Sequence, residues 1–288
     1  MAELLTGTES GIVEAGVVHL EARHVTALAD GWAVVERSVI AERTADGTWA
    51  ERVESPHSLT ALTSSGTGVF LGTSTGEVLR YDGSLRPVPG FDRVAGRDQW
   101  HAVGSSKPYV RSMSTTVDGV LLANVHVGGI PRSTDGGETW EPTIDVDADV
   151  HQVLAHPERP EVAVAAAAVG LAISHDAGTN WTVRTDGLHG TYCRAVAVSG
   201  DTVFVSASTG PFTDRGAIYR GALVDVEPLE RVGDWLDGNI DSGHLAAAGD
   251  AVAFGGPDGQ LHVSDDGGSS WTTRDGVPPV TALVYSRT

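Results

Sequence analysis

The 288-residue chain has a single cysteine, a single lysine and no long apolar run. One cysteine excludes an intramolecular disulfide framework. No apolar stretch approaches the roughly 18 residues that a membrane-spanning helix needs. The N-terminus, M-A-E-L-L-T-G-T-E-S-G, has neither the basic nor the apolar region of a signal peptide. These absences predict a soluble, cytoplasmic protein.

Basic residues are also scarce, since 38 acidic residues stand against 19 basic ones and the net charge is −19. A surface this acidic repels phosphate backbones and anionic lipids. We therefore expect no nucleic-acid partner and no membrane partner. A small molecule is the expected partner, and a monomer is the expected state, although the sequence leaves the oligomeric state open.

Aromatic residues make up only 6% of the chain, yet tryptophan recurs in a fixed setting. Residues 133–140 read S-T-D-G-G-E-T-W, residues 174–181 read S-H-D-A-G-T-N-W, and residues 264–271 read S-D-D-G-G-S-S-W. A shortened copy, T-A-D-G-T-W, covers residues 44–49. The starts of the three full copies lie 41 and 90 residues apart, and 90 is two steps of 45. A period of this length indicates a propeller or solenoid.

These boxes resemble the Asp-box, or bacterial neuraminidase repeat, whose family members are β-propellers. The family includes sialidases, other glycosidases, sortilin-type receptors and assembly factors. The resemblance implies that each box lies on the hairpin between the two outer strands of a blade. It also implies that the aspartate binds backbone N–H groups of the turn and that the tryptophan packs between blades. We therefore expect structural roles for Asp46, Asp135, Asp176 and Asp266.

A second repeat predicts the inner strand of each blade. V-T-A-L occurs at 25–28 and 280–283, L-T-A-L occurs at 59–62, and looser equivalents begin at Tyr109, His151, Arg194 and His244. Seven inner strands predict an all-β, seven-bladed β-propeller that forms one domain over residues 1–288. The last inner strand ends the chain, so we expect it to pair with N-terminal strands. The last blade is then shared between about residues 1–22 and 276–288, which removes free sheet edges.

Histidines gather at the predicted channel mouth, where the inner strands begin and the second strands end. Imidazole is the commonest protein metal ligand, and histidine-rich sets suit zinc, copper, iron or nickel. We therefore expect a ligand site there. In one version of this prediction, the site holds one divalent transition-metal ion and the protein is a metal-dependent enzyme that acts on a small molecule. The predicted metal ligands are His24, His57, His126, His151 and His244. The predicted ligand-binding residues, for a small molecule that is anionic in one form of this prediction, are Arg111, Arg194, Tyr109, Trp100 and His101.

Other functions stay open at this point. The mouth could be a docking surface of an interaction scaffold or assembly factor. A glycosidase, or an enzyme like the streptogramin lyases, which are also seven-bladed propellers, is a further alternative. The sialidase catalytic set is missing, because the F/Y-R-I-P motif does not occur and I-P-R at 130–132 belongs to an Asp-box strand. The catalytic residues and the substrate are not identified by the sequence.

Overall fold

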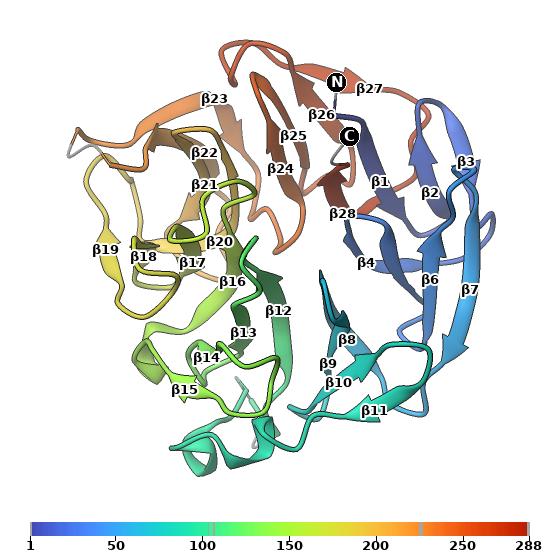
Figure 1. Cartoon of the computed structure of the whole chain (residues 1–288). Coiled ribbons are helices and arrows are strands. Elements are labelled where there is room, and N and C mark those ends of the chain that lie inside the picture. Colours follow the sequence, from blue (N-terminus) through green and yellow to red (C-terminus); the bar gives the residue numbers. More distant parts are fainter. Residues whose placement is uncertain (1, 103, 106, 225–226, 287–288) are drawn as a thin grey trace.

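A computed structural model describes residues 2–102, 104–105, 107–224 and 227–286. Seven four-stranded antiparallel sheets stand around a common axis as the blades of a propeller (Figure 1). The innermost strands contact one another in a closed ring, in the order β4, β8, β12, β16, β20, β24, β28 and back to β4. The predicted all-β, seven-bladed propeller is confirmed.

Each blade runs from an inner strand to an outer one, and we number the blades from β4. Blade 1 holds β4 (Val25–Ala29), β5 (Trp32–Val35), β6 (Val39–Arg43) and β7 (Trp49–Glu54). Blade 2 holds β8 (Leu59–Ser65), β9 (Gly68–Thr73), β10 (Val78–Tyr81) and β11 (Leu85–Pro87). Blade 3 holds β12 (Val110–Thr115), β13 (Leu121–Val125), β14 (Pro131–Ser133) and β15 (Glu141–Pro142).

The second half of the ring repeats this order. Blade 4 holds β16 (Val150–Ala155), β17 (Ala163–Ala167), β18 (Gly170–Ser174) and β19 (Thr182–Arg184). Blade 5 holds β20 (Tyr192–Ser199), β21 (Thr202–Ser208), β22 (Gly216–Ala222) and β23 (Glu230–Leu236). Blade 6 holds β24 (Leu245–Ala248), β25 (Ala251–Gly255), β26 (Leu261–Ser264) and β27 (Thr272–Arg274). Short 3₁₀ turns lie between blades, η1 (Phe91–Arg93) and η2 (Arg97–Gln99) before blade 3 and η3 (Val146–Ala148) before blade 4.

The ring is closed by a sheet built from both ends of the chain. Blade 7 combines β28 (Val280–Tyr285) with β1 (Leu4–Thr8), β2 (Gly11–Glu14) and β3 (Val17–His19). Strand β28 pairs antiparallel with β1, from Leu4 opposite Tyr285 to Thr8 opposite Val280. Figure 1 shows the two termini side by side at this blade. The predicted closure is confirmed: β28 supplies the inner strand that the sheet of β1, β2 and β3 would otherwise lack.

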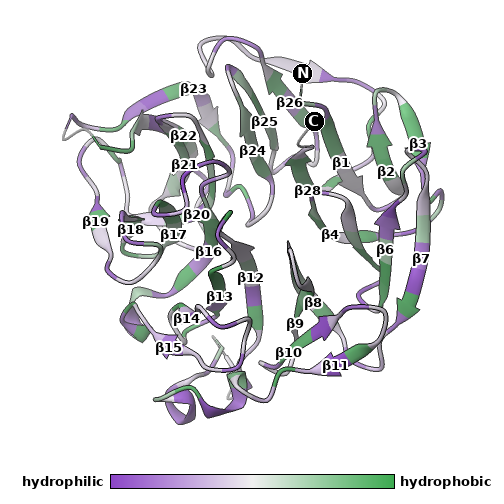
Figure 2. Cartoon of the chain, in the orientation of Figure 1, coloured by the Kyte–Doolittle hydropathy of each residue, from purple (hydrophilic) through white to green (hydrophobic). Residues whose placement is uncertain are grey.

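The core lies between neighbouring blades rather than at the centre of the ring. Each hydrophobic cluster combines strands of two successive blades, as when Val164 and Leu171 of blade 4 pack with Val196 and Val205 of blade 5. Figure 2 shows the hydrophobic colour on strands near the axis, such as β13 and β24, while hydrophilic residues fall on the loops and on outer strands such as β7 and β23. Among the described residues, no helix has the length and apolar character needed to cross a bilayer.

The Asp-boxes take the structural role that the sequence predicts. In blade 3 the box forms the hairpin between β14 and β15, and Oδ1 of Asp135 accepts a hydrogen bond of 2.9 Å from the backbone N–H of Thr139. Trp140 is buried and packs on Phe70 and Val78 of blade 2. The boxes that contain Asp46, Asp176 and Asp266 make the same kind of turn bond. These aspartates hold hairpins and lie between outer strands, away from the strand starts at the channel mouth.

Candidate metal centre at the channel mouth

A β-bulge near the start of the inner strand recurs in six blades. At each bulge the pairing with the second strand shifts by one residue. A bulge changes the direction of the extra side chain, so each of these six blades presents a bulge residue at the same level of the ring. These residues are Thr26, Thr60, Arg111, His151, Arg194 (with Ala195 in the same bulge) and Thr281.

Three of the bulge side chains connect one blade to the next. Oγ1 of Thr60 donates to the carbonyl of Val110 at 2.6 Å, and Oγ1 of Thr281 donates to the carbonyl of Val25 at 2.5 Å. Nδ1 of His151 takes the same role toward the carbonyl of Cys193 at 2.5 Å. A carbonyl only accepts, so Nδ1 carries a proton, and in the neutral form of the ring Nε2 keeps the lone pair.

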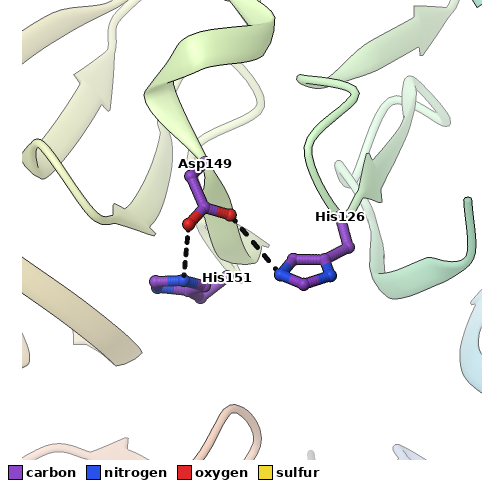
Figure 3. Close-up of side chains that lie close together, drawn as sticks. All are labelled: His126, Asp149 and His151. Carbon is purple, nitrogen blue, oxygen red and sulfur yellow. Dashed lines mark ion pairs between the residues drawn. The ribbon is translucent and has the colours of Figure 1, made fainter. Parts of the chain in front are cut away.

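That free nitrogen faces a carboxylate that a second histidine also faces. Nε2 of His151 stands 3.5 Å from Oδ2 of Asp149, and Nε2 of His126 stands 3.5 Å from Oδ1 of the same residue. Figure 3 shows both rings beside the carboxylate, His151 from β16 and His126 from the turn after β13. One ligand atom from each residue can be chosen so that the three lie within 4.8 Å of one another, and among the described residues this is the group with metal-ligand spacing.

The two histidines are buried and Asp149 is half-buried, and all three side chains are incompletely hydrogen-bonded. His151 has no exposed surface and His126 has 8%, while the Asp149 side chain keeps 22% of its surface exposed. Nε2 of His151, Nδ1 of His126 and Oδ1 of Asp149 are buried atoms without a hydrogen-bond partner in the described part of the chain. Buried polar atoms are normally paired, because leaving one unpaired costs about 1–3 kcal/mol. The unpaired Nε2 of His151 faces Oδ2 of Asp149, and the unpaired Oδ1 of Asp149 faces Nε2 of His126, so a cation between the three side chains would give these atoms a partner.

Strained backbone conformations position the side chains of Asp149 and His126. Asp149 ends η3 in the left-handed region, with φ of 46°, directly before β16. Val127, the residue after His126, has the same φ, which is an outlier for a β-branched residue. The turn after His126 depends on glycine, since a Cβ on Gly129 would meet the carbonyl oxygen of Ile144 at 2.6 Å. Strain of this kind persists where the surrounding structure enforces it and clusters at functional sites.

Electrostatics hold the group in the protonation states that bind metals. Burial and the positive charge of Arg111 lower the pKa of His126 to about 4. At neutral pH His126 is therefore neutral and Asp149 is ionised, which are the forms that ligate a metal.

Two tyrosines and Arg111 border the group. The ring of Tyr109 lies 5.0 Å from that of His126, and the ring of Tyr192 lies 4.6 Å from that of His151, measured between centroids. Arg111 lines the axial cavity, which has a volume of about 1600 Å³. Burial lowers the pKa of the Arg111 guanidinium, and the nearby charge of Arg194 adds to this effect. Within the described residues, Arg111 makes no hydrogen bond or ion pair.

Two further basic residues of the predicted site, Arg194 and His244, form a separate group. Arg194 pairs with Asp241, and both line a cavity of about 350 Å³ together with His244. Burial lowers the pKa of His244, which also bonds the backbone of Thr281. Oγ of Ser242 donates to the carbonyls of His151 at 3.0 Å and Arg194 at 3.1 Å, so the loop before β24 reaches across to blades 4 and 5.

The remaining predicted residues lie in other surroundings. His24 precedes the bulge of blade 1 and its backbone N–H donates to Glu36, while His57 stands 3.6 Å from Glu77. Trp100 is buried against Phe91, with ring centroids 5.4 Å apart, whereas His101 is exposed. Their role in binding a metal or ligand stays a prediction.

Asp149 is the member of the group that sequence reasoning missed. It ends the acidic stretch D-V-D-A-D at 145–149, which reads as a solvated loop. The available signal was its position two residues before His151, at the start of an inner strand. Cys193, beside Arg194, is fully buried, and burial raises the pKa of its thiol to about 12, so it behaves as a small apolar side chain.

Comparison with known proteins supports an Asp-box β-propeller. Residues 132–142 match the family model described as BNR/Asp-box repeat. Similar solved structures include YCF48 bound to a D1 peptide, with a TM-score of 0.62, 16% identity, and coverage of 96% of this chain and 86% of that chain. The GH74 enzyme of Niastella koreensis has a TM-score of 0.60 and 13% identity, over 93% of this chain and 46% of that chain.

A computationally designed protein, Ika8, is similar to the same degree. It has a TM-score of 0.62 and 15% identity, over 97% of this chain and 86% of that chain. No curated protein matches the sequence. At these identities the likeness is one of fold, so any function has to be argued from the site itself.

Proposed function

We propose that this Asp-box β-propeller binds one divalent transition-metal ion through His126, Asp149 and His151, and that the ion holds a small molecule at the channel mouth. The observation that carries the proposal is the pair of 3.5 Å separations between the two Nε2 atoms and the carboxylate. Two ligand atoms of a tetrahedral zinc site stand about 3.4 Å apart, given metal–ligand bonds of about 2.1 Å. Small ring rotations would bring all three atoms to this spacing.

The donor set limits the choice of ion. Two imidazoles and one carboxylate, with further positions open, suit catalytic zinc and also iron(II). Such an ion acts as a Lewis acid on an oxygen of water or of a bound ligand. The chain's own residues fix the site: the carbonyl of Cys193 sets the tautomer of His151, and a hydrogen bond of this kind also orients a ligating ring. Metal-assisted hydrolysis is the reaction class that this arrangement supports.

A second candidate, a protein-docking surface, is favoured by a patch on blade 5. Phe212 is fully exposed and Trp235 is 39% exposed, which is unusual in a chain whose other described phenylalanines are buried. The guanidinium carbons of Arg215 and Arg231 lie 3.7 and 4.7 Å from the Trp235 ring centroid. Exposed aromatic and arginine side chains are enriched at protein interfaces. This patch agrees with the scaffold alternative.

Elemental analysis of purified, untagged protein tests the metal proposal. We expect about one equivalent of zinc or iron per chain in the parent, and a loss of most of it in His126→Ala and Asp149→Asn. His175→Ala is the matched control, because it removes an exposed imidazole from an Asp-box hairpin and should keep the metal. A parent without a stoichiometric transition metal, or an Asp149→Asn variant that retains it, would contradict the proposal.

A further inference from the structure

Arg111 departs from the pattern that the other bulge residues follow. Thr60, His151 and Thr281 each donate to the carbonyl of the next inner strand. Arg194, the other arginine in this position, pairs with Asp241. Arg111 has neither kind of partner within the described residues, although burial lowers its pKa. The half-buried guanidinium of Arg111 is therefore free to bind an anionic ligand through charge-assisted hydrogen bonds.

Arg111 also lies close to the metal-binding group. Its bulge and that of His151 lie at the same level on the neighbouring inner strands β12 and β16. The ring of Tyr109, two residues before Arg111, lies 5.0 Å from that of His126, and the ring of Tyr192 lies beside His151. The Arg111 side chain also borders the axial cavity of about 1600 Å³, so a ligand held between the proposed ion and Arg111 can extend into the channel.

The charges around this point select the ligand. An imidazole that ligates a metal is neutral, and the Arg194–Asp241 pair is neutral as a unit. A divalent ion and Arg111 contribute three positive charges and Asp149 removes one, which leaves about two positive units in a protein whose net charge is −19.

We infer that the ligand of this site is a tetrahedral oxyanion with two negative charges, of the phosphate-monoester class, bound between the metal and Arg111. The inference rests on the proposed metal site and adds the chemical class of its ligand. Guanidinium groups bind such oxyanions through paired, charge-assisted hydrogen bonds. A carboxylate or a sulfonate carries one charge less and would leave the site with an uncompensated positive charge.

Calorimetric titration of the metal-loaded protein with three matched probes at about pH 8 tests the inference. Phenylphosphonate is a tetrahedral dianion, benzenesulfonate has the same shape with one charge less, and benzoate is a planar monoanion. We expect phenylphosphonate to bind at least about tenfold more tightly than either monoanion. Arg111→Met should lose about tenfold or more of this affinity while it keeps one metal equivalent and the parent melting temperature.

Arg93→Met is the matched control, because it removes the same charge from an exposed 3₁₀ turn and should bind phenylphosphonate like the parent. The inference is overturned if the metal-loaded parent binds phosphonate and sulfonate equally, or if Arg111→Met binds phosphonate as the parent does. Both outcomes leave the metal site standing. A parent that binds no metal overturns the proposed function itself, and the ligand inference with it.

Discussion

At the scale of single residues, the same position in the repeat serves two purposes. His151 takes the blade-connecting hydrogen bond that threonine makes in blades 2 and 7, and its second nitrogen then remains free to face Asp149. Asp135 and its counterparts have only the structural purpose. The sequence predicted the Asp-box role from its spacing, and it predicted His126 and His151 from residue type and register. It did not predict Asp149, because the left-handed backbone conformation that brings this loop residue next to His126 and His151 cannot be read from the sequence.

The Asp-box aspartates make a prediction about acid stability. Hydrogen bonds from the Thr139 side chain and backbone are the largest causes that lower the pKa of Asp135 to about 2 from the usual 3.8. The main hydrogen bonds from Thr44 and Ser270 do the same for Asp46 and Asp266. A lowered folded-state pKa stabilises the fold above the unfolded pKa, and this stability is lost as the pH falls from about 4 to about 2.

Urea unfolding at several pH values measures this effect. The free energy of unfolding of the parent should fall through that window, and Asp135→Asn should show a shallower fall because it lacks the titrating group. Asp118→Asn, which removes an exposed acid outside the boxes, serves as the control and should follow the parent. Identical slopes for the parent and Asp135→Asn would contradict the proposed role of the box.

At the scale of elements, side chains of the inner strands bind neighbouring strands across the blade boundaries. Oγ of Ser112 accepts the N–H of Val153 at 2.9 Å, and Oγ of Ser114 accepts the N–H of Ala155 at 2.9 Å. The V-T-A-L repeat was enough to predict that the inner strands exist. It did not predict the bulges, since the extra residue shows only in the register with the second strand. His24, which the sequence predicts at the start of an inner strand, therefore precedes the bulge, and Thr26 is the bulge residue.

The side chain of Gln152 bonds the backbone of blade 5 and of the loop before β24, and its removal should destabilise the ring. Its side chain bonds N–H and C=O of Val196 at 3.2 and 3.3 Å, and accepts the N–H of Gly243 at 3.0 Å. Gln152→Ala leaves these buried groups without a partner, so we expect a loss of about 2 kcal/mol or more in the free energy of unfolding. Gln99→Ala, at an exposed position, is the control for chemical denaturation. A Gln152→Ala variant as stable as the parent would show that water replaces these bonds.

At the scale of the whole molecule, the ring brings residues that are distant in sequence to one level around one axis. The repeat period and the unpaired last strand were enough to predict seven blades and their closure, because both follow from local patterns. The site was predictable only in part. Which of the histidines meet depends on loop paths and on the left-handed turns at Val127 and Asp149, and no repeat encodes these. The proposed site therefore lies where the blades differ, at Arg111, His126, Asp149 and His151.

The most direct test of the central claim is a crystal structure of the zinc-loaded protein, with anomalous diffraction measured on both sides of the zinc absorption edge. The account predicts one strong anomalous peak per chain, about 2.0–2.2 Å from Nε2 of His126, Nε2 of His151 and an oxygen of Asp149. The peak should be absent from crystals of Asp149→Asn. A strong peak elsewhere on the molecule, with none between these three side chains, would contradict the account.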